Sequence, residues 1–328
     1  MHDVAALSGV SAATVSRFLR GQRARSAEAI QAAVDQLGYK PSVEARALKT
    51  GRRYYVGVVV PDIGNPYFGA VVKGMESALR DSGYRILLAS TDEDSARESD
   101  ILADMSRRVD GLILAPTTEG SRAPLAVREG PPMVFIDRDV TGGDRFDSVL
   151  VDNYDGGRQA AEHLLSLGHT RIAAINAALN STPGRTRRAG FVDTLATAGI
   201  EIPPEYDRIG DFREAGGYQQ TLALLALPTP PTAIFTANNL MTLGACKALR
   251  AMRVDVPREV SLIGFDDLDF GELMAPPLTV IDRPTVTQGV LAMRLLLGQL
   301  ENPEADRVPR RIVLDVKLIE RGSTAGPA

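Results

Sequence analysis

Within the first forty residues, apolar side chains recur at helical spacing in three short runs, and glycine separates the runs. Ser11 and Ser26 are typical N-cap residues for the second and third runs. In the third run, Ile30, Val34 and Leu37 recur at i, i+4 and i+7, which defines the face expected to be buried. The pattern therefore predicts three short helices at the start of the chain.

After Tyr54 the pattern changes to short apolar strands that alternate with amphipathic helices. The predicted strands are Tyr55–Val60, Arg85–Ala89, Gly111–Ala115, Met133–Ile136, Val149–Val151, Arg171–Ile175, Ala233–Thr236, Ser261–Gly264 and a last strand at 310–320. The predicted helices are Phe68–Ser82, Ser95–Arg107, Gly156–Leu167, Leu240–Met252 and Thr285–Leu300. Strands joined by helical crossovers are typical of doubly wound parallel sheets, and two successive sets predict two similar lobes in an α/β fold.

Composition excludes several classes of protein. With 44% hydrophobic and 24% charged residues, the 328-residue chain has the composition of a globular protein of two or three domains. The one cysteine, Cys246, cannot form an internal disulfide, which is typical of a reducing compartment. No apolar stretch has the roughly 18 residues that a membrane helix needs, and the N-terminus shows no signal-peptide pattern. We therefore expect a cytoplasmic protein without membrane contact.

The net charge of −4 conceals two segments of opposite sign. Residues 1–53 contain nine Lys and Arg against four Asp and Glu, a formal charge of +5, which leaves −9 for the rest of the chain. Such an asymmetry indicates a small anion-binding module joined to a larger acidic body.

The basic segment has the order of a helix-turn-helix, in which the second helix lies in the major groove of DNA. The candidate DNA contacts on and just before that helix are Ser11, Ala12, Ala13, Thr14, Ser16 and Arg17. Arg17 is the one long outward donor and suits a bidentate contact with guanine, whereas the hydroxyl groups suit phosphates. A solvated amphipathic helix is the alternative interpretation of such a segment.

Polar side chains follow several predicted strands, at the edge where open parallel sheets bind ligands. These positions are Asp62–Phe68, Asp137, Arg138, Asp152, Asn153, Asn238, Asn239, Asp266 and Asp267, with Arg187 at a helix start. Carboxylates and amides suit the vicinal hydroxyls of a sugar-like ligand. The rings of Tyr67, Phe68, Phe212 and Phe270 are candidate apolar faces for it. Two facing lobes with these groups would form a typical small-ligand cleft.

Motifs along almost the whole chain point to one family. They are Asp3-Val4-Ala5, Gly9-Val10-Ser11-x-x-Thr14-Val15-Ser16-Arg17, Leu37-Gly38-Tyr39-Lys40-Pro41, Ala45-Arg46-x-Leu48, Asn65-Pro66-Tyr67-Phe68, Val109-Asp110-Gly111-Leu112-Ile113, Gly168-His169-x-Arg171-Ile172-Ala173, Arg187-x-Ala189-Gly190-Phe191 and Gly264-Phe265-Asp266-Asp267. Together they resemble the lac repressor/galactose repressor family of bacterial transcription regulators. The resemblance implies an all-α helix-turn-helix domain before a two-lobed, periplasmic-binding-protein-like core of doubly wound parallel sheets.

The resemblance also implies a domain organisation. The expected parts are a DNA-binding domain at 1–40, a hinge helix and linker at 41–52, and an effector-binding and dimerisation core at 53–328. The first lobe would span about 53–153 plus 284–308, and the second about 154–281 plus 309–328. The chain would cross between the lobes near 152–155, 279–284 and 308–311.

A hinge helix carries further DNA contacts in this family. Two hinge helices pair across the dimer, and a leucine from each wedges into a base step of the minor groove. The resemblance assigns this wedge to Leu48 and further contacts to Ala45 and Lys49. The eight-residue stretch 42–49 is too short to be a stable helix alone, so it should fold only with its twin and DNA. Alternatively, Leu48 packs on the core as part of a linker.

The resemblance assigns seven residues to an effector site between the lobes. They are Tyr67, Phe68, Asp137, Arg187, Phe212, Asn238 and Asp266. The neighbouring Asn239 stands where Asp is more usual. For Asp152 and Asp267, capping a helix or bracing a loop is an equal alternative, and Phe270 is expected to pack.

These observations predict a homodimeric repressor that binds a pseudo-palindromic operator in double-stranded DNA under control of a small ligand. A sugar or sugar derivative fits the cleft, although purine-binding relatives share most of these positions. A transport-type sugar-binding protein would share the core but lack the basic module. The sequence contains none of the common nucleotide-binding, metalloprotease or hydrolase motifs, so we expect no enzyme, cofactor or metal site. His163 and His169 are expected to be surface or structural residues.

Overall fold

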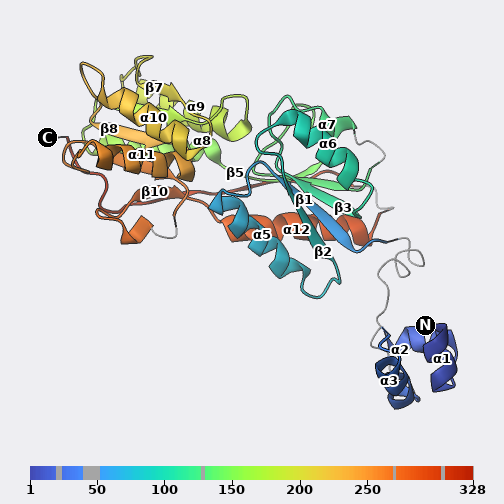
Figure 1. The fold of residues 1–328 in the computed structure, drawn as a ribbon. Helices are drawn as coiled ribbons and strands as arrows, with labels where there is room; N and C mark the ends of the chain where they lie inside the picture. The colour runs from blue at the N-terminus through green and yellow to red at the C-terminus, as the bar shows by residue number, and fades with distance from the viewer. Residues whose placement is uncertain (20–23, 40–51, 127–129, 269–270, 304–306, 328) are drawn as a thin grey trace. The chain divides into compact units, whose positions relative to one another are not determined.

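The computed structural model describes residues 1–19, 24–39, 52–126, 130–268, 271–303 and 307–327 (Figure 1). The chain divides into two compact units, Met1–Tyr54 and Tyr55–Ala328, here named the N-terminal unit and the core unit. Within the described ranges, no helix has the length and apolar character needed to span a membrane.

The N-terminal unit contains three short helices, as the sequence predicts. They are α1 (His2–Ser8), α2 (Ala12–Phe18) and α3 (Ala27–Gln36). Ser11 caps α2, because its hydroxyl oxygen accepts a hydrogen bond from the backbone N–H of Thr14 at 3.2 Å. Gly9 ends α1 at φ 64°, in the left-handed region that glycine enters without steric cost.

One small apolar cluster holds these helices together. Its fully buried members are Val4, Val15 and Ile30. The predicted buried face of α3 is wrong at its end: Val34 is only partly buried, and Leu37 is 46% exposed. The reason is that α3 stops at Gln36, so Leu37 is its C-cap and lies beyond the helical face. The predicted hinge helix at 42–49 falls outside the described residues.

The first lobe of the core unit is a six-stranded sheet of order β11-β5-β4-β3-β1-β2, with all neighbouring strands parallel. Its strands are β1 (Tyr55–Val60), β2 (Arg85–Ser90), β3 (Gly111–Leu114), β4 (Met133–Ile136), β5 (Asp147–Val151) and β11 (Arg311–Leu314). Its helices are α5 (Pro66–Leu79) and α12 (Thr285–Glu301) on one face, and α6 (Ser95–Met105) and α7 (Ala123–Ala126) on the other (Figure 1). The central strands are buried, as expected of strands covered on both faces.

The second lobe is a six-stranded sheet of order β12-β10-β9-β8-β6-β7, in which β12 is antiparallel to β10 and the other pairs are parallel. Its strands are β6 (Ile172–Asn176), β7 (Asp207–Ile209), β8 (Ala233–Thr236), β9 (Ser261–Phe265), β10 (Thr279–Asp282) and β12 (Lys317–Ile319). Its helices are α8 (Asn153–Ser166), α9 (Thr182–Thr197), α10 (Glu214–Leu225), α11 (Asn239–Ala251) and the 3₁₀ turn η1 (Gly271–Leu273). The two sheets confirm the predicted doubly wound α/β architecture.

The last predicted strand requires a correction. The sequence predicts one strand at 310–320 in the second lobe, whereas β11 pairs in parallel with β5 in the first sheet and only β12 joins the second. The third crossing between the lobes therefore lies between Leu314 and Lys317, not near 308–311. Apolar residues recur at every second position from Ile312 to Leu318, so a period of two cannot show where the chain changes sheets.

Reciprocal glycines bring α8 and α9 into close contact. A Cβ on Gly157 would lie 2.1 Å from the carbonyl oxygen of Arg187, and a Cβ on Gly190 would lie 2.0 Å from that of Tyr154. Both distances are far below van der Waals contact, so only glycine permits this helix spacing. The close approach positions α9, which carries Arg187.

Two buried histidines of the second lobe hold the C-terminal segment. Nε2 of His169 donates to the carbonyl oxygen of Ala325 at 2.8 Å, and Nε2 of His163 lies 2.8 Å from the hydroxyl oxygen of Thr324. Both histidines are buried, so they are structural residues and not surface residues.

Acid is expected to destabilise the core unit through these histidines. Burial lowers the pKa of both rings, so the unfolded chain binds more protons than the folded chain between the two sets of pKa values. Their contribution to the free energy of unfolding is complete above about pH 6.5 and declines as the pH falls through the lowered values. Denaturant titrations near pH 5 and near pH 7 should differ less for His169→Asn than for the unmodified protein. An identical pH difference in both proteins would contradict this role.

Candidate functional site

Two aspartates at strand ends bring charge from different lobes to one place. Asp137 follows β4 in the first lobe, and Asp266 follows β9 in the second. Both are buried and both have left-handed backbone angles, φ 64° and φ 74°. Phe212, another predicted site residue, has φ 65°. Left-handed residues other than glycine cost on the order of 1–3 kcal/mol, and such strain concentrates at functional sites.

Arg283 links these two aspartates and is a site residue that sequence reasoning missed. It directly follows β10, and its Nη1 lies 2.5 Å from Oδ1 of Asp137. Its Nε and Nη2 both donate to the carboxylate of Asp266, the latter at 3.2 Å. The guanidinium carbon lies 3.5 Å from the centre of the Tyr67 ring. A strand at 279–282 would have pointed to Arg283 as the polar residue after it, but the sequence predicts only a crossing between the lobes at 279–284.

Mutual stabilisation keeps this cluster charged. Burial opposes ionisation of Asp137, but Arg283 and Arg138 hold the pKa of its carboxyl below the ordinary value. Burial also disfavours the charged form of Arg283, but the carboxylates of Asp266 and Asp137 raise its pKa above the ordinary value. Burial raises the pKa of the Tyr67 hydroxyl well above its ordinary value, so Tyr67 stays neutral and donates to Gln288 at 2.7 Å.

Arg187 enters the same region from α9 with its side chain fully buried. Its Nε donates to Oδ1 of Asn153 at 2.7 Å, and its Nη1 donates to the carbonyl oxygen of Ala237 at 2.6 Å. Its guanidinium carbon lies 3.5 Å from the centre of the Phe265 ring. Both acceptors are uncharged, and burial together with repulsion from Arg283 lowers the pKa of Arg187 to about 10. Arg187 therefore remains a cation at neutral pH.

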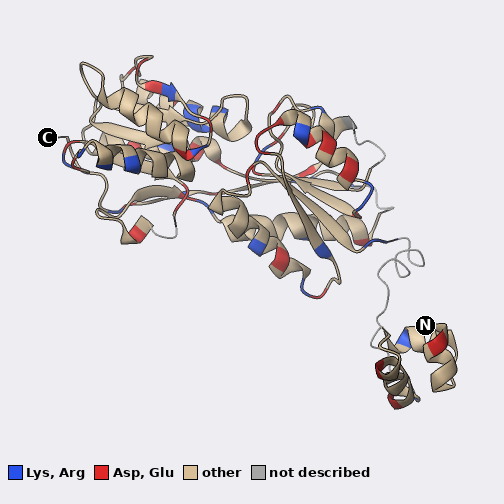
Figure 2. Cartoon of the chain, in the orientation of Figure 1, with Lys and Arg blue, Asp and Glu red and all other residues tan. Residues whose placement is uncertain are grey.

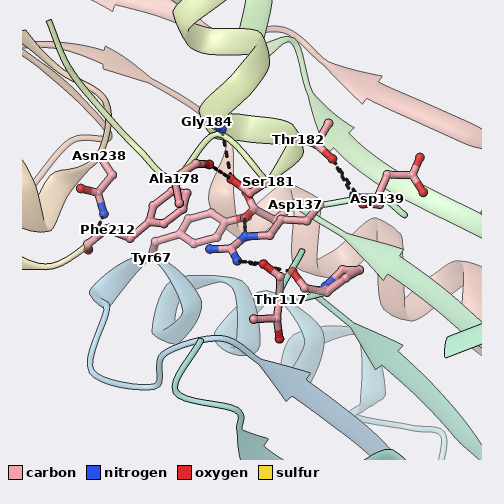
Figure 3. A network of polar contacts seen from close by, with 12 residues as sticks. Tyr67, Thr117, Asp137, Asp139, Ala178, Ser181, Thr182, Gly184, Phe212 and Asn238 are labelled. Atoms are coloured by element: carbon pink, nitrogen blue, oxygen red, sulfur yellow. Dashed lines mark hydrogen bonds and ion pairs between the residues drawn. The ribbon is translucent and has the colours of Figure 1, made fainter. Parts of the chain in front are cut away.

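Asn238 and Phe212 are joined by a hydrogen bond (Figure 3). The side-chain amide of Asn238 donates to the carbonyl oxygen of Phe212 at 2.9 Å, while its oxygen caps α11. The Phe212 ring lies 4.6 Å from the guanidinium carbon of Arg138, which belongs to the first lobe. Arg138 in turn forms a bidentate ion pair with Glu93 through two hydrogen bonds of 2.7 Å. Figure 3 shows Asn238, Phe212, Tyr67 and Asp137 gathered around one region.

Polar contacts join the two lobes across the cleft. Beyond the Arg283 cluster, Arg185 of α9 pairs with Glu119 of the first lobe at 2.9 Å. The amide of Asn239 donates to Asn65 at 2.8 Å, so the position where Asp is more usual contacts the opposite lobe. Next to this region is a cavity of about 560 Å³, whose lining includes Tyr67, Asp266 and Arg283. Its size lies within the range of small-ligand pockets.

The remaining predicted residues have structural contacts. Asp152 caps α8, with its carboxylate accepting from the backbone N–H of Asp155 at 2.8 Å. Asp267 accepts from Arg321 at 2.8 Å and so braces the C-terminal segment. Phe68 is buried in the first-lobe core, with its ring centre 4.7 Å from that of Tyr67. Phe270 lies outside the described residues, and within the described part of the chain no His, Cys, Asp and Glu residues form a candidate metal site.

The second helix of the N-terminal unit presents the predicted DNA-facing residues. Ser11, Ala13 and Arg17 are exposed, whereas Ala12, Thr14 and Ser16 are half-buried. The hydroxyls of Ser11 and Thr14 lie 2.9 Å apart and bond to each other. Arg17 is the one Lys or Arg within the three helices, where Figure 2 shows acidic residues on α1 and α3. The predicted contacts Ala45, Leu48 and Lys49 lie outside the described residues.

Two features define the class of protein. The first is a three-helix unit with an exposed arginine on its second helix, and the second is a two-lobed core with a polar cleft. The protein is a DNA-binding transcription regulator with a ligand-binding core, not an enzyme. Residues 1–42 match the bacterial regulatory proteins of the lacI family, and residues 161–324 match the periplasmic binding protein-like domain. The chain belongs to the LacI family.

Relatives in this family match the chain over nearly its whole length. The ribose operon repressor of Escherichia coli K12 is 36% identical, with 98% of this chain and 99% of the relative covered. The HTH-type transcriptional repressor PurR of Haemophilus influenzae PittEE is 33% identical, with 98% and 97% covered. Among solved structures, the lac repressor dimer bound to operator and the anti-inducer ONPF is 28% identical, with a TM-score of 0.85 and 98% of each chain covered. The CelR–cellobiose complex is 31% identical, with a TM-score of 0.74 and 98% of each chain covered.

Proposed function

We propose that this regulator is a homodimeric repressor that changes its affinity for a pseudo-palindromic operator when an uncharged, sugar-like ligand binds between its lobes. The supporting observation is the cluster of two carboxylates and two guanidinium groups beside aromatic rings at the strand ends. The proposed ligand-binding residues are Tyr67, Phe68, Asp137, Arg187, Phe212, Asn238 and Asp266. Because Phe68 is buried, it would contribute indirectly, by packing against the Tyr67 ring.

Charge balance favours an uncharged ligand. The cations Arg187 and Arg283 equal the anions Asp137 and Asp266 in number, and Arg138 is paired with Glu93. An uncharged ligand preserves this balance, whereas an anion would add an uncompensated charge to a buried site at a large desolvation cost. Hydroxyl groups donate well to carboxylates and accept from guanidinium groups, which is the hydrogen-bonding pattern of a sugar. The names of the ribose operon repressor and the CelR–cellobiose complex support a sugar as the ligand.

The DNA side of the proposal depends on α2. Its exposed arginine would read a base edge, and Ser11, Thr14 and Ser16 would contact phosphates, with Ala12 and Ala13 against the groove. Ala45, Leu48 and Lys49 would add minor-groove contacts from a hinge helix that folds on DNA. A two-fold dimer would place two such helices on the two half-sites. Because it works on DNA in a bacterium, we place the protein in the cytoplasm.

The domain organisation completes this proposal. The DNA-binding domain would occupy 1–40, the hinge 41–52 and the effector-binding core 53–328. Ligand binding between the lobes would change their relative angle and thereby the spacing of the two hinges. Operator affinity would therefore change, because the ligand site and the DNA site would both shift the equilibrium between the same two states of the dimer interface.

The ligand-binding proposal is tested by replacing Asp266 and its neighbour. Asp266→Asn should weaken binding of D-ribose by about 10- to 100-fold, since a hydrogen bond to a charged group contributes roughly 1.5–3 kcal/mol. Asp267→Asn is the matched control: Asp267 also lines the cavity, but its carboxylate pairs with Arg321 and not with the cluster. Binding is measured by isothermal titration and by thermal shift, in which a ligand raises the unfolding temperature.

A wider thermal-shift screen decides the class of ligand. We expect uncharged sugars, with D-ribose tested first, to stabilise the protein more than sugar acids or nucleobases do. Stabilisation by a sugar acid or a purine with no response to any uncharged sugar would contradict the proposed ligand class. Equal losses in Asp266→Asn and Asp267→Asn would contradict the proposed site.

A further inference from the structure

Arg283 connects three parts of the core unit. Its backbone lies where the chain passes from β10 of the second lobe to α12 of the first. Its side chain contacts Asp137 of the first lobe and Asp266 of the second, and it is 5% exposed. We name this three-residue ion cluster the Arg283 bridge. It joins the two lobes at the segment about which they would move.

The Arg283 bridge occupies the groups that the proposed ligand needs. Nη1 takes one oxygen of Asp137, and Nε and Nη2 take both oxygens of Asp266. The guanidinium also lies against the face of Tyr67, 3.5 Å from the ring centre. A sugar uses the same features, because its hydroxyls donate to carboxylates and its C–H face packs on a ring. Arg283 therefore uses part of the hydrogen-bonding capacity of both carboxylates and covers one face of Tyr67, and a ligand would compete with it for these positions.

The bridge is more deeply buried than the two other ion pairs between the lobes in the described part of the chain. The ion pairs Arg185–Glu119 and Arg213–Asp92 have at least one partner that is half exposed or more, so solvent screens them. In the Arg283 bridge all three side chains are at most 6% exposed. Removing the cation would leave the buried carboxylate of Asp266 without an ion pair and that of Asp137 with Arg138 at 3.7 Å, which is unfavourable while the cleft is closed. The bridge therefore favours the closed cleft in the absence of ligand.

We propose that the Arg283 side chain occupies part of the ligand site when no ligand is bound. In this position it sets the affinity for the ligand and holds the lobes together until a ligand takes its place. This inference rests on the proposed function, because it takes Asp137 and Asp266 to be ligand-binding groups. The apparent affinity for the ligand is therefore reduced, because only those protein molecules in which the Arg283 bridge is broken can bind the ligand. On ligand binding the guanidinium would leave the hydrogen-bonding positions on the two carboxylates but remain beside them as a counter-charge, so the charge balance is kept. The lobes would then be connected through the ligand and no longer directly through Arg283.

A distance measurement without ligand tests the bridge. Cysteines for spin labels are placed at Ser95 of α6 and Ala215 of α10, two exposed residues in different lobes, with Cys246 replaced by Ser. In the full chain, Arg283→Gln should lengthen and broaden the inter-label distances, because the shorter neutral side chain cannot hold both carboxylates. Arg188→Gln is the matched control, since Arg188 pairs with Asp207 within the second lobe. Identical distance distributions in Arg283→Gln and the control would overturn the bridge.

Titration with D-ribose tests the competition. Arg283→Gln should bind D-ribose at least about fivefold more tightly than the unmodified protein, while Arg188→Gln should bind it equally well. Weaker or unchanged binding by Arg283→Gln would overturn the inference and make Arg283 an ordinary ligand contact or a structural residue. If D-ribose binds none of these proteins, that result contradicts the proposed ligand, and the distance measurement still decides whether the bridge holds the lobes.

Discussion

Replacing Arg17 with Ala is expected to lower operator affinity by roughly tenfold to a hundredfold. A bidentate arginine–guanine contact contributes about 1–3 kcal/mol of discrimination between bases, and Arg17 is an exposed residue in the last turn of α2. The folding of the N-terminal unit should survive the change, because its core consists of other side chains such as Val15 and Ile30. Operator affinity should therefore fall while the helical content stays the same.

The measurement uses an operator selected in vitro and a scrambled duplex of equal length. Fluorescence anisotropy at fixed salt gives both affinities, because affinity for DNA depends steeply on salt. Arg188→Ala is a charge-matched control that removes one cation from the second lobe. We expect Arg17→Ala to lose affinity mainly for the operator and to retain most of its affinity for scrambled DNA. Equal losses on both duplexes would make Arg17 a phosphate contact, and no loss would remove it from the interface.

Replacing Gly190 with Ala is expected to destabilise the core unit, although alanine favours helices by about 1 kcal/mol over glycine. The new Cβ would lie 2.0 Å from the carbonyl oxygen of Tyr154, which belongs to the backbone of α8 and cannot rotate away. The added methyl group would therefore push α8 and α9 apart and disrupt their packing. Overpacking of this kind lowers the free energy of unfolding by about 1–3 kcal/mol. The shift would also displace Arg187, one turn earlier on α9, so ligand binding should weaken as well.

Gly298 provides the matched control for this prediction. It lies within α12, and beyond its chain neighbours and the backbone of its own helix no atom lies within 4 Å of a Cβ built on it. Gly298→Ala should therefore keep or raise the free energy of unfolding, by up to about 1 kcal/mol. Denaturant titration of the two variants measures the difference directly. If Gly190→Ala were as stable as Gly298→Ala, the close approach of α8 and α9 would not limit the residue at 190.

Much of the fold followed from local patterns. All eight strands predicted from Tyr55 to Gly264 are present, each within two residues of its predicted ends. Buried parallel strands are recognisable because both faces are covered and their sequences are apolar throughout. The short edge strand β7 was missed because Asp207–Ile209 contains one apolar residue. Strand β10 has only four residues and directly precedes the passage of the chain to α12, so the sequence predicts a crossing there and not a strand.

The candidate site was predictable only in part. Asp137 and Asp266 could be selected because each follows the carboxyl end of a strand, the edge at which open parallel sheets bind ligands. Asp152 and Asp267 occupy equivalent positions in the sequence, yet they cap α8 and pair with Arg321. Nothing local separates these two outcomes, because the decisive partner is far away along the chain.

The sequence by itself determined the basic three-helix unit, the two α/β lobes and most of the polar residues at their strand ends. Capping, periodicity and charge are properties of neighbouring residues, so they are readable without coordinates. Only the tertiary structure decided that Arg283 lies between Asp137 and Asp266, and that residues 311–319 divide between two sheets. Both depend on contacts between residues far apart in the chain, and the energy of a buried ion cluster depends on which partners the fold brings together.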